Sequence, residues 1–115
     1  MEPQPRFFQG VYAFVGRGFE EPFQLADELT YSVPESKRAQ LIYFRGGNSS
    51  PEMIYVVLLR DGKPMRYFPI GAKGDTHVQL AVVEDLVTRS QLDVRLAAPE
   101  KTSGVVVLDF GLLEF

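Results

Sequence analysis

Short apolar runs separated by turn residues recur along the whole chain, and they constrain its fold more than any other feature. The runs are rich in Val, Ile, Tyr and Phe, while Gly, Pro, Asn and Asp stand between them. Helical periodicity is nearly absent. This pattern is typical of an all-β sandwich or barrel. We predict strands at residues 7–15, 28–33, 39–45, 52–60, 63–69, 77–83, 91–97 and 104–115.

Polar clusters mark the turns between these strands. Asp61-Gly62 is the strongest, because this dipeptide supplies the positive φ angles of a type I′ turn and predicts a hairpin. Loops are predicted at residues 46–51, 71–75 and 99–104. Residues 83–90 are expected to connect two strands, with at most one helical turn. About eight strands arranged in this way suit a two-sheet antiparallel β-sandwich, a jelly roll.

Length and composition bound the class of protein. The 115 residues suit one domain, 1–115, and the absence of cysteine excludes disulfides and thiolate metal sites. A net charge of −3 lacks the basic field that nucleic-acid binding needs. No apolar run could cross a bilayer, and the start of the chain does not resemble a signal peptide. For a complete chain we therefore expect a cytoplasmic domain that binds neither nucleic acid nor membrane.

Alternation predicts which face of each strand is buried. The residues expected to point inward are Val78, Leu80, Val82, Leu92, Val94, Leu96, Val106, Leu108, Phe110 and Leu112. Residues 41–44, 53–59 and 105–113 are apolar on both faces, which a sheet open to water on one side should not be. Either residues 16–26 pack across the outer face of these strands, or another subunit covers that face. The second alternative predicts a homo-oligomer.

Five motifs follow one another in the order of a known family. They are the Val33-Pro34 turn, the strand that closes on Arg45-Gly46-Gly47-Asn48, the Asp61-Gly62 turn, the Phe68-Pro69 step and the Leu108-Asp109-Phe110 step. From Glu28 onward this order resembles a galactose-binding-like jelly roll, and more narrowly the carbohydrate-binding modules of families 6 and 35. The chain departs from that pattern because it has no Trp and because a glycine follows Arg45, where the family has an aromatic residue.

Planar polar groups and aromatic rings suit sugar recognition, and the resemblance implies a sugar site at the loop ends of the sandwich. The candidate ligand contacts are Tyr43, Arg45, Asn48, Arg66, Tyr67 and His77. Purely structural roles are the alternatives. Arg45 would pair with a carboxylate, Asn48 would occupy a positive-φ turn position, and His77 would be a surface strand residue.

Asp109 is a carboxylate among apolar neighbours, so it must be paired, coordinated or protonated. The resemblance implies that it binds a structural calcium ion, with Glu20 or Glu21 as a further ligand. A salt bridge to an arginine, or hydrogen bonds to the backbone, is the alternative.

An enzyme is not expected. A single histidine cannot form a multi-histidine metal site, and no serine lies in a nucleophile-elbow pattern. The adjacent pair Glu84-Asp85 does not suit glycoside hydrolysis, which needs two carboxylates facing each other across a cleft. We predict a non-catalytic binding and assembly domain that self-associates. The alternative is a carbohydrate-binding module that recognises a sugar at its loop ends.

Overall fold

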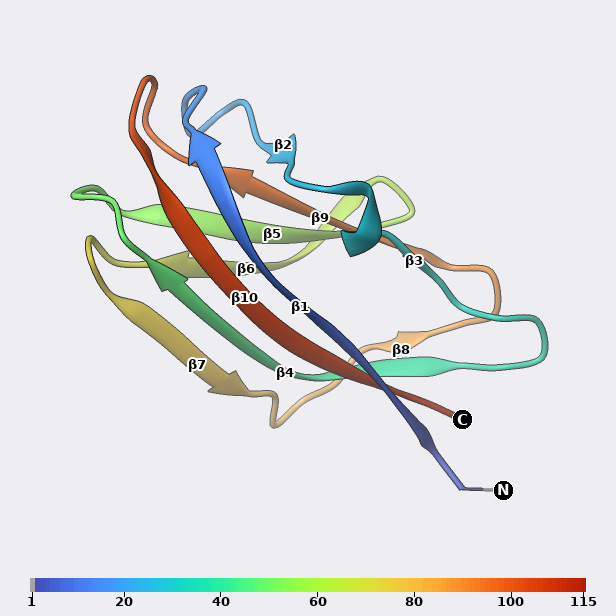
Figure 1. Ribbon diagram of the computed structural model, residues 1–115. Coiled ribbons are helices and arrows are strands. Elements are labelled where there is room, and N and C mark those ends of the chain that lie inside the picture. The colour runs from blue at the N-terminus through green and yellow to red at the C-terminus, as the bar shows by residue number, and fades with distance from the viewer. Residues whose placement is uncertain (1) are drawn as a thin grey trace.

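Two antiparallel sheets packed face to face form the fold in the computed structural model, which describes residues 2–115 (Figure 1). Sheet A has the order β1-β10-β4-β7, with β8 paired to β4, and sheet B has the order β2-β9-β5-β6, with β3 paired to β9. The strands are β1 (Gln4–Val15), β2 (Phe23–Gln24), β3 (Tyr31–Ser32), β4 (Ala39–Asn48), β5 (Ile54–Arg60), β6 (Lys63–Ile70), β7 (Asp75–Gln79), β8 (Asp85–Leu86), β9 (Gln91–Ala97) and β10 (Ser103–Glu114). The predicted all-β jelly roll is confirmed. Residues 2–115 contain no helix long and apolar enough to cross a membrane.

The predicted hairpin and most of the predicted inward faces are confirmed. Asp61 and Gly62 have φ angles of 50° and 83° and join β5 to β6. The alternating apolar residues of β9 and β10 are at most 1% exposed, and they pack between the two sheets. Strand alternation therefore identifies the core correctly wherever the strand itself is correctly placed.

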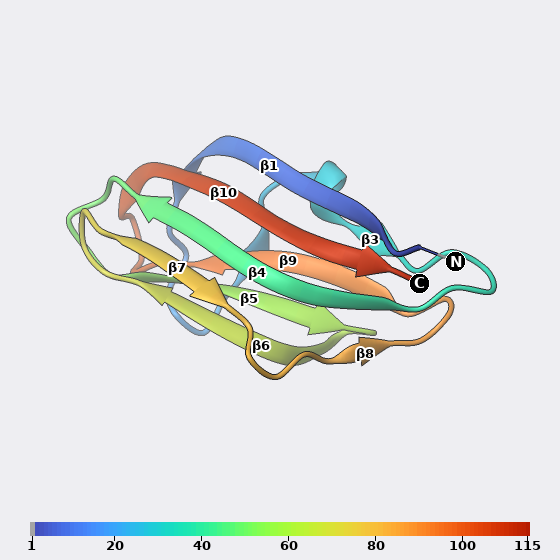
Figure 2. The ribbon, with the colours of Figure 1, turned by 90° about the horizontal axis from the view of Figure 1, so that it is seen from below.

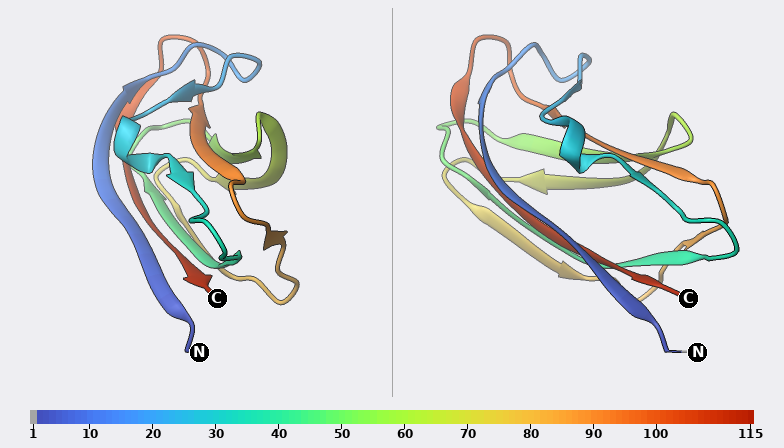
Figure 3. Two further views of the ribbon diagram at one scale, coloured as in Figure 1. Left: turned by 90° about the vertical axis from the view of Figure 1, so that its right-hand side faces the viewer. Right: turned by 45° about the vertical axis from the view of Figure 1, so that its right-hand side comes forward.

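The predicted strand at 28–33 is wrong in its first half, and only Tyr31–Ser32 form a strand. A 3-10 turn, η1 (Asp27–Leu29), occupies its first half, and only β3 pairs with β9. The Thr30 N–H donates to the Asp27 carbonyl at 3.1 Å, and this local bond replaces a sheet bond. Figure 3 shows η1 and β3 between β1 and β9, where they close one edge of the sandwich.

The predicted strand at 77–83 ends too late, because β7 stops at Gln79. The Leu80 N–H still donates to the Ile42 carbonyl at 3.0 Å, at the point where β4 bulges in its pairing with β10, and beyond this point β4 pairs with β8 instead of β7. Val82 is therefore 73% exposed rather than inward. Residues 83–90 hold the short strand β8 and no helical turn.

The predicted loop at 46–51 begins too early, since β4 continues through Gly46 and Gly47 to Asn48. Glycine is rare inside strands, and the two adjacent glycines are the reason that the sequence suggests a loop here. In the structure their positions on opposite faces of sheet A become important for the candidate site.

The apolar outer face of β5 is covered from within the same chain. Val57 is 2% exposed, and it lies directly opposite Arg95 of β9, which Asp93 holds in an ion pair at 2.9 Å. Residues 16–26 extend the edge of sheet B, because β2 pairs with β9. The Phe19 ring in this segment stacks on Tyr55. The outer face of β5 therefore does not require another subunit.

A buried carboxylate joins the end of β10 to β1 and β3. Glu114 is 1% exposed, Tyr31 donates a hydrogen bond to its Oε2 at 2.5 Å, and Arg6 Nε lies 3.1 Å from its Oε1. Burial acts to raise the pKa of Glu114, but the Tyr31 hydrogen bond and the Arg6 charge outweigh it and hold that pKa below its usual range.

We expect this cluster to make stability depend on acid. Because the folded-state pKa of Glu114 lies below that of the unfolded chain, its contribution is complete at neutral pH and is lost as pH falls through the folded value. Glu114→Gln should lower the free energy of unfolding by about 1–3 kcal/mol at pH 7. Urea denaturation at pH 7 and pH 3 measures the difference in free energy of unfolding between the native chain and Glu114→Gln. This difference should be smaller at pH 3.

Glu35→Gln is the matched control, because Glu35 and Arg89 form an ion pair with both side chains at least two-thirds exposed. Such a pair is worth at most about 1 kcal/mol. If Glu114→Gln lowered the free energy of unfolding by the same amount at both pH values, the lowered pKa of Glu114 would be contradicted.

Candidate functional site: a groove on the outer face of sheet A

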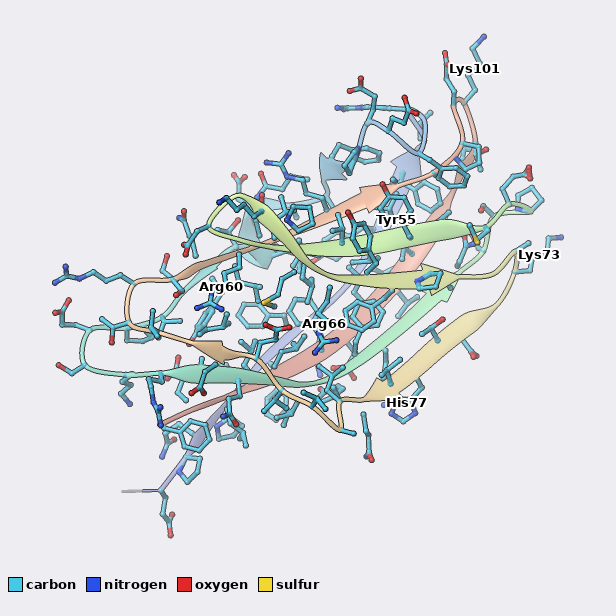
Figure 4. All side chains as sticks on the ribbon, turned by 180° about the vertical axis from the view of Figure 1, so that it is seen from behind. Tyr55, Arg60, Arg66, Lys73, His77 and Lys101 are labelled. Carbon is cyan, nitrogen blue, oxygen red and sulfur yellow. The ribbon has the colours of Figure 1, made fainter. Side chains whose placement is uncertain are left out.

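Strand register lines up four polar residues across the outer face of sheet A. Gln9 lies opposite Asp109, Asp109 opposite Arg45, and Arg45 opposite His77, so the row crosses β1, β10, β4 and β7. The side chains point outward because their strand neighbours, such as Phe44 and Phe110, fill the core. Figure 4 shows His77 on β7 with its side chain directed away from sheet B.

A shallow groove lies beside this row, where Gly47 supplies no side chain. Gly47 stands between Val107 of β10 and Asp75 of β7 in the next row of the sheet. The groove has a volume of about 440 Å³. It is lined by Arg45, Gly46, Gly47, Asp75, Thr76, His77, Val107 and Asp109.

Asp109 is held by three donors from the two strands that flank β10. The Tyr43 hydroxyl donates to its Oδ1 at 2.7 Å, Gln9 Nε2 donates to the same oxygen at 3.4 Å, and Arg45 Nη1 lies 3.8 Å from Oδ2. Burial, together with the hydrogen bond to Asp109, raises the pKa of Tyr43 to about 12. Tyr43 therefore remains a protonated donor at neutral pH and fixes the orientation of this carboxylate.

Gly111 makes this arrangement possible. It lies opposite Tyr43, and a Cβ atom at this position would come within 2.4 Å of the tyrosine ring. The ring therefore lies across β10 in the space that a side chain would fill, and its hydroxyl reaches Asp109.

The neighbours of Asp109 do not fit the calcium site that the resemblance implies. Calcium needs six or more oxygen ligands, whereas the groups around Asp109 are a hydroxyl donor, an amide donor and a guanidinium. Residues 2–115 contain no cluster of three or more acidic or histidine side chains that could hold a metal. This environment favours the alternative expectation, a salt-bridged carboxylate.

The structure brings together only half of the predicted ligand contacts. Tyr43, Arg45 and His77 share the outer face of sheet A, on the face of the sheet rather than at its loop ends. Tyr67 lies on sheet B, opposite Val57, and is 59% exposed.

Asn48 and Arg66 have structural partners instead. Asn48 is 5% exposed and has no positive φ angle, so the expected turn position is wrong; its side chain bonds to the loops that follow β4 and β6. Arg66 points across the open edge of the sandwich, where its Nη2 donates to the Val82 carbonyl at 3.1 Å and pairs with Glu84 at 3.3 Å (Figure 4).

Several residues of the groove and of the polar row beside it escape sequence reasoning. Gln9, Asp75 and Val107 have ordinary strand positions, and nothing local marks them. Gly47 does carry a signal, since glycine inside a strand often marks a close approach by a ligand or by another backbone. Taking Gly46-Gly47 as a loop hides that signal.

No protein-family model and no curated protein matches the sequence. Among solved structures, the chain is similar to the CBM36-1 domain of a multidomain xylanase from the hindgut metagenome of Trinervitermes trinervoides. The identity is 12%, the TM-score is 0.49, and the match covers 92% of this chain and 96% of that domain.

The chain is also similar to a structure of infectious bursal disease virus, Gt strain. The identity is 9%, the TM-score is 0.53, and the match covers 97% of this chain but only 32% of the viral chain. At these identities the likenesses concern the fold alone.

Proposed function

We propose that this chain is a non-catalytic binding domain, and that its ligand lies in the groove over Gly47 on the outer face of sheet A. The observation that carries the proposal is the groove itself. Its floor is a bare stretch of backbone, and polar side chains from three strands stand around it. Backbone left uncovered on an exposed sheet face lets a ligand approach the sheet closely.

The chemistry of the lining favours a neutral, polyhydroxylated ligand, such as a carbohydrate. Arg45 and His77 offer donors, while the carboxylates of Asp75 and Asp109 offer acceptors, so adjacent hydroxyl groups could bind both kinds of partner. Val107 adds an apolar contact for the carbon atoms of a sugar ring. The mixed charges give no strong preference for an anion.

The same lining gives no support to catalysis. Asp109 is engaged by Tyr43 and Gln9, and the Thr76 hydroxyl donates to the Pro69 carbonyl at 2.7 Å. Among the described residues, the groove contains no serine or cysteine beside a base. Binding is therefore the activity that the geometry supports best.

Filling the groove is expected to abolish binding without disturbing the fold. A Cβ atom on Gly47 would meet only Val107 Cβ, at 3.9 Å, so Gly47→Val places its methyl groups in the groove. We expect affinity for xylohexaose, cellohexaose or galactose to fall at least about tenfold, which corresponds to roughly 1.4 kcal/mol. Isothermal titration calorimetry measures these affinities for the native chain and for the variant.

Gly71→Val is the matched control, because a Cβ atom at Gly71 meets nothing within 4 Å and Gly71 does not line the groove. His77→Ala should weaken binding by several-fold through the loss of one donor. A folded protein that binds none of these sugars at millimolar concentration would contradict the choice of ligand. Binding that survives Gly47→Val would contradict the location.

An assembly role is the second candidate, and a specific surface favours it. Large apolar side chains remain exposed along β1 and β10 on the outer face of sheet A, and we call them the apolar strip. The strip consists of Phe7, Val11, Val15, Val105 and Val107, which are between 37% and 68% exposed. The Gln9–Asp109 pair separates Phe7 from the four valines. Exposed apolar side chains gathered on one face in this way are typical of an interaction surface.

A further inference from the structure

We infer that the free edge of β1 pairs antiparallel with β1 of a second copy of this chain, about a two-fold axis that passes between the two copies of Val11. The inference rests on the assembly role and names its partner and its geometry. β1 lies at the margin of sheet A, as Figure 2 shows, and it pairs with β10 on one side only. In the described part of the chain, no strand pairs with its other side.

η1 and β3 lie beside β1, but β3 pairs with β9 and not with β1. Residues 7–15 of β1 themselves lack the protective features that edge strands usually carry. Monomeric proteins place charges, prolines or bulges on such edges, or keep them short. β1 has 12 residues and pairs with β10 without a register shift. Residues 7–15 contain no charge and no proline. Pro5 and Arg6 lie at the start of β1, where Arg6 pairs with Glu114. From Phe7 to Val15 the strand is regular and uncharged, which favours pairing with another strand.

The side chains of β1 are complementary to themselves. Phe7, Val11 and Val15 point to the outer face, four residues apart, and each is at least 60% exposed. Antiparallel pairing about Val11 places Val11 against its own copy, and Phe7 against Val15 on both sides of the axis. Cross-strand pairs of aromatic and β-branched residues are the pairs that stabilise sheets.

The register shifted by one residue, about Gly10, fits less well. Pairing about Gly10 would place Phe7 against Ala13 and Val11 against Gln9, so large side chains would meet small or polar ones. A second copy supplies the matching pattern without any further assumption, and two-fold dimers are the commonest soluble oligomers. This self-match is the reason for choosing a second copy over an unrelated strand.

The pairing has a consequence for the groove. It would join the two copies of sheet A into one continuous sheet. The strand order would be β7-β4-β10-β1 in one copy, followed by β1-β10-β4-β7 in the other. Because the two-fold axis is perpendicular to that sheet, both grooves would open on the same side. A polymeric ligand with repeated units could then occupy both grooves at once, which raises its apparent affinity.

The mass of the full chain in solution, measured by light scattering over a concentration series, tests the pairing. We expect a dimer of twice 12.9 kDa for the native chain. Val11→Lys places two like charges across the two-fold axis and should raise the dissociation constant at least tenfold. Val82→Lys is the control, since Val82 is 73% exposed away from β1, and it should remain dimeric.

A covalent readout keeps the test decisive even if Val11→Lys misfolds. The chain has no cysteine, so Val11→Cys introduces a single thiol on the axis, and mild oxidation should yield a disulfide-linked dimer while Val82→Cys yields little. A native chain that is monomeric at every concentration would overturn both the assembly role and this inference. A native dimer that persists in Val11→Lys and is not cross-linked through Val11→Cys would overturn only the pairing through β1.

Discussion

Phe44→Ala is expected to lower the free energy of unfolding by about 3–5 kcal/mol, the cost of removing a large side chain from a packed core. Phe44 is fully buried, and its ring stacks on Phe68 of the opposite sheet with centroids 4.1 Å apart and planes 5° apart. It also contacts Phe110, so its loss would open a cavity between the two sheets directly beneath Arg45.

Two further variants separate this effect from a general sensitivity to mutation. Phe44→Leu retains most of the buried volume and should cost clearly less. Tyr67→Ala removes an aromatic residue that is 59% exposed, and it should cost less than about 1 kcal/mol. Urea denaturation followed by circular dichroism measures all three variants. A loss below about 1 kcal/mol for Phe44→Ala would show that this ring does not hold the sheets together.

The second large effect is expected at Asn48, at the end of β4. Its Nδ2 donates to the carbonyls of Glu52 and Gly71 at 2.8 and 3.1 Å, and its Oδ1 accepts from the Ser50 N–H at 2.9 Å. Asn48→Ala removes these three bonds and leaves the Ser50 N–H without an acceptor in a largely buried position, while the Glu52 and Gly71 carbonyls keep their bonds from the Ser50 hydroxyl and the Gly74 N–H. We expect it to lower the free energy of unfolding by about 2–3 kcal/mol.

Asn48→Asp is the sharper comparison, because it keeps the acceptor and the side-chain size but directs a carboxylate at two carbonyl oxygens. It should destabilise at least as much as alanine. Asn48 does not line the groove, so the folded fraction of either variant should bind ligand with unchanged affinity. A variant that loses affinity but retains its stability would restore Asn48 as a ligand contact.

Local signals account for the parts of the fold that were predicted correctly. β9 alternates strictly, and its predicted bounds coincide with those observed, because a half-buried strand needs apolar residues on one face only. The Asp61-Gly62 turn was equally clear, since few dipeptides adopt its φ angles easily. The errors lie where a distant strand decides the outcome, as at Gln79, where β7 stops beside the bulge of β4 and β8 takes over the pairing.

The candidate site shows the same division. The sequence shows that Tyr43, Arg45 and His77 are residue types suited to binding. It does not show that Asp109 and Gln9 lie beside them on sheet A, because these two residues are far away in the chain. Asn48 and Arg66 have equally suitable chemistry, yet loop carbonyls and the connection after β7 engage them. The sequence indicates which side chains could bind, and long-range pairing decides which of them are available.

The amino-acid sequence by itself determined the fold class, the hairpin and the inward faces of the last two long strands, because alternation and turn chemistry act between residues close together in the chain. Only the tertiary structure decided that Gly46 faces the core while Gly47 forms the floor of a groove, and that β1 ends the sheet with a free edge. Both depend on strand order and register, which are set by contacts between segments about 60 to 100 residues apart. Such contacts leave no local pattern from which they could be predicted.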